Sequence, residues 1–119
     1  MIEGHAEEKN TADFAARHRP VQYKTMGASN LTASQAGFGC YRVSIDVKHH
    51  ENAMRKALTS GINIVDTSTN YANGGSEKLV GKVLDDMISE GALSRQEVIV
   101  VSKAGYLQGE NYALSQERK

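Results

Sequence analysis

Short apolar runs alternate with longer segments of helical periodicity from residue 35 onward. Three runs are candidate strands: 35–40 (QAGFGC), 62–65 (INIV) and 98–101 (VIVV). The first is weakened as a strand by its glycines. The last two lack alternating polar positions, which is typical of strands covered on both faces. Strands separated by helical segments favour a parallel sheet with helical crossovers, so the pattern predicts an α/β fold.

Two helices are predicted between these strands. The first has its apolar residues on one face, with Asp46 as a candidate N-cap and Gly61 as a terminator. The second has a broader apolar stripe, with Ser76 as a candidate N-cap and Gly91 as a terminator. The stripe consists of Leu79, Val80, Val83, Leu84, Met87 and Ile88.

The chain before these elements divides into two parts. Residues 1–20 are rich in charge and end at Pro20, so they are interpreted as a polar N-terminal tail with a helical turn or two near Phe14. Residues 21–34 contain two short strand-like runs around the turn-forming segment 27–30, which predicts a β-hairpin. Residues 35–119 then hold the three strands and two helices.

Composition and charge limit the classes of partner. The chain has 39% hydrophobic and 24% charged residues, and its 14 Lys and Arg balance its 14 Asp and Glu. Without net positive charge there is no field to attract nucleic acid or an anionic membrane surface, and no run is long enough to span a bilayer. The single Cys40 and the charged opening segment indicate a reducing, cytoplasmic location.

Charged residues follow the second and third predicted strands. Asp66 comes directly after 62–65, and Lys103 follows 98–101 after one serine. The carboxyl ends of parallel strands form the functional edge of α/β folds, so adjacent strands would bring the two charges together at the mouth of a cleft. Taken singly, each residue is also compatible with a plain role at a turn or in solvent.

A tyrosine lies close to this pair in the sequence. Tyr71 is five residues beyond Asp66, in the loop that follows the second strand. An ammonium about 4 Å from a phenol favours the phenolate by up to about 4 kcal/mol at an effective dielectric constant of 20. Tyr71 is therefore a candidate proton donor assisted by Lys103 and Asp66. The alternative is an amphipathic anchor packed in the loop.

Two other patterns are weaker. His49 and His50 are adjacent, and adjacent helical residues point about 100° apart, so no metal site is predicted. The segment 37–42 (GFGCYR) lacks the third glycine and the acidic residue of the dinucleotide-binding fingerprint.

The segments 61–81 (GINIVDTSTNYANGGSEKLVG) and 94–105 (SRQEVIVVSKAG) closely resemble the aldo-keto reductases. The order of the Asp-Thr-Ser sequence, the tyrosine five residues after the aspartate, the Gly-Ser-Glu sequence and the lysine after the next strand follows the family's pattern. Segment 31–42 (LTASQAGFGCYR) resembles the family's first strand, and the preceding hairpin resembles the one at the bottom of its barrel.

The resemblance implies a (β/α)8 TIM barrel that uses NADPH to reduce a small carbonyl substrate. In that family pattern Tyr71 is the general acid, while Lys103 assists it and Asp66 pairs with the lysine. Glu77 also matches a family position. A glutamate in the first turn of a helix is equally explained by its favourable interaction with the positive end of the helix dipole.

The resemblance also implies cofactor contacts. Gly39, Cys40, Tyr41 and Asp66 match positions that approach the nicotinamide and the substrate. Cys40 and Tyr41 stand where threonine and tryptophan are frequent in the family, a departure that bears on substrate preference.

A closed barrel needs about 250 residues, so 119 residues are expected to provide only the hairpin and the first three β/α units. The family's catalytic histidine would then lie beyond Lys119. Three functions stay open: an NADPH-dependent carbonyl reductase, a nucleotide-binding regulatory or interaction module of the same fold, and an inactive fragment that associates into a homo-oligomer.

Overall fold

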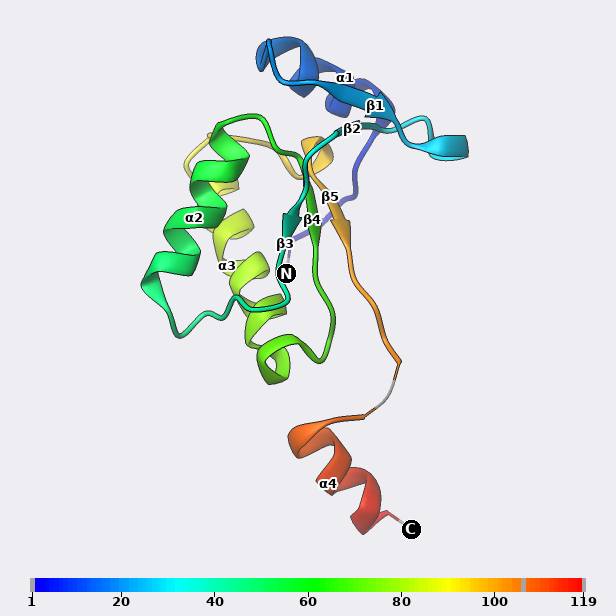
Figure 1. Cartoon of the computed structure of the whole chain (residues 1–119), viewed down its shortest axis with the longest axis vertical. Helices are drawn as coiled ribbons and strands as arrows, with labels where there is room; N and C mark the ends of the chain where they lie inside the picture. Colours follow the sequence, from blue (N-terminus) through cyan, green and yellow to red (C-terminus); the bar gives the residue numbers. More distant parts are fainter. Residues whose placement is uncertain (1, 106, 119) are drawn as a thin grey trace.

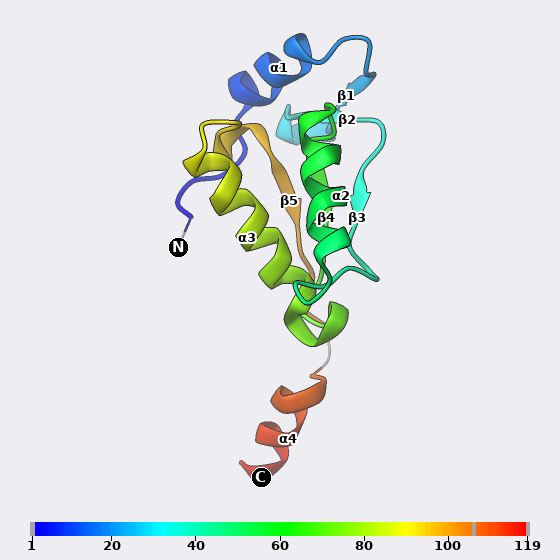
Figure 2. The ribbon, with the colours of Figure 1, turned by 90° about the vertical axis from the view of Figure 1, so that its left-hand side faces the viewer.

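A three-stranded parallel sheet forms the centre of the molecule. The computed structural model describes residues 2–105 and 107–118. Two helices cover the same face of the sheet (Figures 1 and 2). The strands, in their order across the sheet, are β3 (Phe38–Gly39), β4 (Ile64–Asp66) and β5 (Ile99–Val101), and the helices are α2 (Lys48–Thr59) and α3 (Gly75–Ser89).

The register of the sheet explains where the core lies. Val65 of β4 pairs with Phe38 of β3 and with Val100 of β5, and these three residues pack on the helical side. Between sheet and helices, the apolar stripe predicted for α3 is buried, apart from the partly buried Ile88. The predicted strands and the crossover helices are thereby confirmed, although β3 is reduced to two residues.

The ends of the helices follow their glycines but not their predicted caps. Gly61 and Gly91 both adopt positive φ, which lets the chain leave each helix without a side-chain clash. Neither Asp46 nor Ser76 is an N-cap, since Val47 precedes α2 and Gly74 precedes α3. The Ser76 hydroxyl is instead committed to buried hydrogen bonds described below.

The hairpin lies at the amino-terminal ends of the strands. Its strands β1 (Tyr23–Thr25) and β2 (Thr32–Ser34) pair antiparallel around the turn η1 (Gly27–Ser29). The fully buried Asn63, next to β4, joins the two sheets. Its Oδ1 accepts from the Ser34 N–H at 2.9 Å, and its Nδ2 donates to the carbonyls of Thr32 (2.9 Å) and Glu97 (3.3 Å).

The N-terminal segment is not a tail, which corrects the prediction for residues 1–20. Helix α1 (Glu8–Arg17) packs against β2 and the turn η3 (Arg95–Glu97), with Phe14 only 2% exposed. Thr11 accepts the backbone N–H of Thr32 at 3.0 Å, and Arg17 forms an ion pair with Glu97. The helix forms because partners far away in sequence bury its one apolar face.

A further helix, α4 (Gly109–Glu117), follows β5 and extends away from the rest of the molecule (Figure 1). It corrects the expectation of only two helices in residues 35–119. None of its residues is buried, and its weak amphipathic pattern explains why the sequence did not reveal it. No helix in the described part of the chain is both long and apolar enough to cross a membrane.

Ion pairs on the outer surface connect α2 to α3. Glu51, whose side chain is only 12% exposed, binds Lys48 at 3.2 Å and Lys82 at 3.0 Å. Hydrogen bonds from Lys82 and then Lys48 lower the pKa of Glu51 below its ordinary value. A carboxyl group of this kind stabilises the fold above its unfolded-state pKa of about 4.3, and the contribution is lost as the pH falls through the folded-state pKa.

The Glu51→Gln variant is therefore expected to have a lower free energy of unfolding at neutral pH, with the deficit shrinking as the pH falls below about 4. Urea denaturation at a series of pH values measures the difference. Glu110→Gln is the matched control, because Glu110 lies on the exposed α4 and forms no ion pair among the described residues. A deficit that persists at acid pH would show that packing, rather than charge, accounts for the effect of Glu51.

Candidate active site

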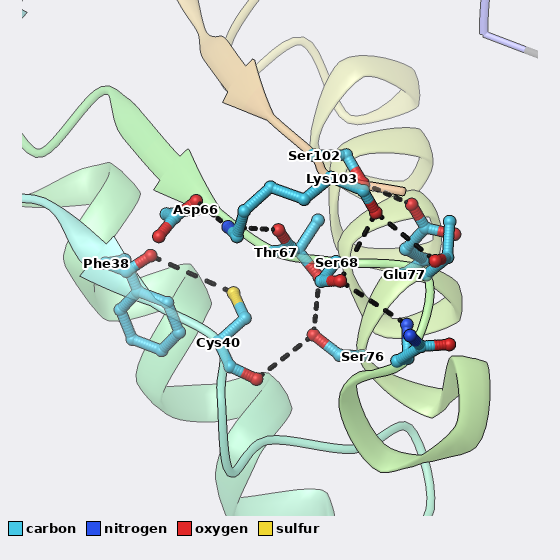
Figure 3. A network of polar contacts seen from close by, with 11 residues as sticks. Phe38, Cys40, Asp66, Thr67, Ser68, Ser76, Glu77, Ser102 and Lys103 are labelled. Carbon is cyan, nitrogen blue, oxygen red and sulfur yellow. Dashed lines mark hydrogen bonds and ion pairs between the residues drawn. The ribbon is translucent and has the colours of Figure 1, made fainter. Parts of the chain in front are cut away.

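Asp66 and Lys103 meet at the carboxyl end of the sheet (Figure 3). Asp66 pairs with Val101 in the register, so the lysine two residues later lies at the same edge. Lys103 Nζ is 2.5 Å from Asp66 Oδ1 and donates to the Thr67 carbonyl at 2.6 Å. The ion pair expected from the ends of the two strands is therefore present in the structure.

Tyr71 lies beside this ion pair. It begins the turn η2 (Tyr71–Gly74), and Lys103 Nζ is 5.2 Å from the centroid of its ring. The pKa of Lys103 is raised above its ordinary value, chiefly by the hydrogen bond to Asp66 and less by Tyr71. Lys103 is consequently a cation at neutral pH, held next to a phenol.

A cleft of about 390 Å³ opens over Tyr71 and Lys103. The rings of Tyr41 and Tyr71 meet edge to face, with centroids 5.2 Å apart and an interplanar angle of 84°. Tyr41 is 66% exposed, so it forms an outer wall of the cleft. The lining residues are Tyr41, Ser68, Asn70, Tyr71, Lys103, Ala104, Gly105 and Gln108.

Gly39 and Cys40, at the end of β3, differ from Tyr41 in their position relative to the cleft. Cys40 is fully buried, and its burial raises the pKa of the thiol to about 11, so it is not a thiolate nucleophile at neutral pH. Neither Cys40 nor Gly39 lines the cleft, although Gly39 pairs with Asp66 in the register. A Cβ on Gly39 would meet no atom within 4 Å, so the edge of the sheet beside Asp66 is open.

Buried hydroxyl groups hold the loops of the site in place, a role that the sequence pattern did not reveal. Thr67 Oγ1 and Ser76 Oγ are 2.7 Å apart, and Ser76 Oγ donates to the Cys40 carbonyl at 3.1 Å (Figure 3). Ser68 Oγ donates to the Lys103 carbonyl at 3.2 Å. The polar Asp-Thr-Ser run directly after a buried strand was the available signal, because a buried hydroxyl needs a hydrogen-bond partner.

Glu77 connects α3 to the end of β5. Its Oε1 accepts a hydrogen bond of 2.5 Å from Ser102 Oγ, one residue before Lys103 (Figure 3). The contact fixes the segment that carries Lys103, a role of Glu77 that its position in the first turn of a helix does not predict.

One of the two adjacent histidines contributes to the structure. His50 Nδ1 accepts the backbone N–H of Ser44 at 3.0 Å, which fastens the loop before α2 to the helix. Across residues 2–105 and 107–118, no group of three or more His, Cys, Asp or Glu side chains is placed to hold a metal ion.

Comparison with known proteins decides the family. The model of the Aldo/keto reductase family matches residues 25–118, which include the whole cleft. The chain belongs to this family. The resemblance found in the sequence is thus confirmed, and α1 lies outside the matched aldo/keto reductase region.

Two individual relatives illustrate the similarity. The chain is 39% identical over 75 residues to an NADPH-dependent aldose reductase of Saccharomyces cerevisiae, covering 63% of this chain and 21% of that protein. It is 30% identical over 86 residues to a probable voltage-gated potassium channel subunit beta of Oryza sativa subsp. japonica, covering 70% of this chain and 25% of that protein.

A solved structure gives the same result for the fold. The holo form of an aldo-keto reductase from Bacillus halodurans aligns with a TM-score of 0.62 and 33% identity, over 76% of this chain and 28% of that one. The open sheet described above matches part of that structure, and the barrel is not closed. The chain spans about a quarter of the length of the relatives it matches.

Proposed function

We propose that the protein is an NADPH-dependent oxidoreductase that reduces an aldehyde or ketone to an alcohol. The proposal rests on one observation: Tyr71, Lys103 and Asp66 come together beside a single cleft. NADPH supplies a hydride to the carbonyl carbon when it is bound. Tyr71 donates its phenolic proton to the carbonyl oxygen, and the Lys103 ammonium favours the phenolate that is left.

Asp66 acts through Lys103 in this proposal. Its carboxylate, 2.5 Å from Nζ, keeps the ammonium charged and directed toward Tyr71. Without Asp66, the ammonium would lose its main charged partner and the position that this contact defines. Asp66 is therefore a positioning residue for the proton donor.

The open edge of the sheet fits a planar cofactor ring. The space above Gly39 has no side chain, and it adjoins Asp66 and the backbone of Cys40 and Tyr41. These four residues would hold the nicotinamide end of NADPH. Relatives named as an NADPH-dependent aldose reductase and an NAD(P)H-dependent D-xylose reductase support this cofactor class.

The proposal extends to the whole fold and its setting. We propose that the sheet is the first part of a (β/α)8 barrel, that the substrate is a small carbonyl compound, and that the protein works in the cytoplasm. The relatives, about four times as long as the matched segment, support the barrel.

A second candidate function is favoured by the rice relative, which is named as a channel subunit. In that alternative the protein binds the nucleotide and acts as a regulatory or interaction module with little turnover.

Turnover and binding measurements distinguish the candidates. The polypeptide that carries this sequence, at its full encoded length, is assayed for NADPH oxidation with a panel of aldehydes, and NADPH binding is measured by calorimetry. A reductase is expected to bind NADPH and oxidise it only when an aldehyde is present. Binding without turnover would favour the regulatory module. Absence of both, with concentration-dependent association in sedimentation, would favour a self-associating fragment.

A further inference from the structure

We infer that Arg42 selects carbonyl substrates that carry a carboxylate. The inference rests on the proposed function, because it names the substrate class of the same cleft. It is carried by a chain of contacts from the proton donor to an exposed guanidinium, and by the balance of charge around the cleft.

The contacts lead outward from Tyr71. The ring of Tyr41 contacts the ring of Tyr71 edge to face, and the Arg42 guanidinium carbon lies 5.6 Å from the centroid of Tyr41. Arg42 is therefore separated from the proton donor by one aromatic ring. Arg42 does not itself line the cleft, so the inference places it at the rim beside Tyr41, where a substrate long enough to pass Tyr41 would reach it.

The charges leave Arg42 available for a ligand. Lys103 is already neutralised by Asp66, and none of the described residues that line the cleft is an aspartate or glutamate. Arg42 is exposed, and its contact with Tyr41 is the one electrostatic interaction it makes within the described residues. Among the residues that the structure describes, a substrate carboxylate at this rim would meet the Arg42 guanidinium, and no carboxylate of the cleft lining would compete with it.

The chemistry of the side chain suits this role. A guanidinium presents donors in a fixed planar arrangement that matches both oxygens of a carboxylate. The cation–π contact with Tyr41, 5.6 Å from the ring centroid, favours positions of the guanidinium beside the mouth of the cleft. A substrate with a methyl group in place of the carboxylate would gain nothing from the charge of Arg42.

Two matched substrates test the inference. Butanal and 4-oxobutanoate share a four-carbon aldehyde chain and differ in a terminal methyl or carboxylate group. For the full-length protein we expect kcat/KM to be about tenfold or more higher for 4-oxobutanoate, a difference of at least about 1.4 kcal/mol. We expect Arg42→Gln to remove the preference, Arg42→Lys to keep part of it, and the KM for NADPH to stay unchanged.

The control variant is Lys24→Gln. Lys24 is an exposed cation on β1, at the opposite end of the strands, so its loss tests the effect of net charge alone. Equal kcat/KM for the two aldehydes in the wild type would overturn the inference. So would a preference that survives in Arg42→Gln or that is lost equally in Lys24→Gln. A changed KM for NADPH, without a change in aldehyde preference, would assign Arg42 to the cofactor instead.

A binding measurement separates this inference from the proposed function. Calorimetry compares 4-hydroxybutanoate with 1-butanol, the alcohols that correspond to the two aldehydes, in the presence of NADP+. If no aldehyde is turned over but the acid binds to wild type and not to Arg42→Gln, the reductase proposal fails and Arg42 is left as a carboxylate-binding residue without a role in substrate selection. If both aldehydes are reduced equally and the acid does not bind preferentially, the inference fails and the reductase proposal stands. If neither turnover nor preferential binding is found, both fail.

Discussion

Replacing Tyr71 with phenylalanine is expected to lower kcat for aldehyde reduction by about 10²–10⁴-fold, the range typical of a lost general acid. The phenol is the group beside the Lys103 ammonium that can give a proton to the carbonyl oxygen, while the ring alone preserves the packing against Tyr41. Cofactor binding should be unchanged, because the variant loses only a hydroxyl. Steady-state kinetics and NADPH titration of the full-length protein measure the two effects.

Tyr112→Phe is the matched control for this prediction. The same hydroxyl is removed from a tyrosine that is 55% exposed on α4 and absent from the lining of the cleft. Its kcat should equal that of the wild type. Turnover by Tyr71→Phe within a few-fold of the wild type would contradict the assignment of Tyr71 as the proton donor.

Replacing Asn63 with leucine is expected to lower the free energy of unfolding by about 3–5 kcal/mol, because buried polar groups left without partners cost about 1–3 kcal/mol each. The variant removes the acceptor for the Ser34 N–H and the donors to the Thr32 and Glu97 carbonyls. These groups belong to β2 and to η3, which precedes β5, so the side-chain link between the hairpin, η3 and the start of β4 would be lost while the backbone pairing of β4 with β5 remains.

Urea denaturation of the full-length protein measures this loss, with Asn52→Leu as control. Asn52 lies on the exposed surface of α2, where the same substitution buries no unpaired group. We expect it to change the unfolding free energy by less than about 0.5 kcal/mol. A loss of similar size in both variants would mean that leucine itself, rather than the missing hydrogen bonds, destabilises the protein.

The sequence predicts the sheet and its covering helices because their signals are local. Val98 lies within a continuous apolar run and Val65 within one that only Asn63 interrupts, and both are fully buried between the sheet and the helices. The burial of Phe14 was not predictable in the same way. It depends on surfaces from β2 and η3, which lie far along the chain and which no local pattern associates with α1.

The residues of the site also divide into those that the local sequence predicts and those that tertiary contacts place. Asp66 and Lys103 could be paired from the sequence because each follows a strand in the same parallel sheet. The misassignment of Ser76 as a cap has a tertiary cause, since its hydroxyl bonds to Thr67 and to the Cys40 carbonyl. The fully buried position of Cys40 likewise depends on α2 and α3 packing over the end of β3.

The strands lie across the sheet in the same order as along the chain, β3, β4 and β5. On the ribosome, where the N-terminal part of a chain is released first, β3 and α2 emerge before β4, and α3 emerges before β5. No strand has to be inserted between two that are already paired. The sheet can therefore grow during synthesis in one direction, and its growing edge exposes only the newest strand to neighbouring chains.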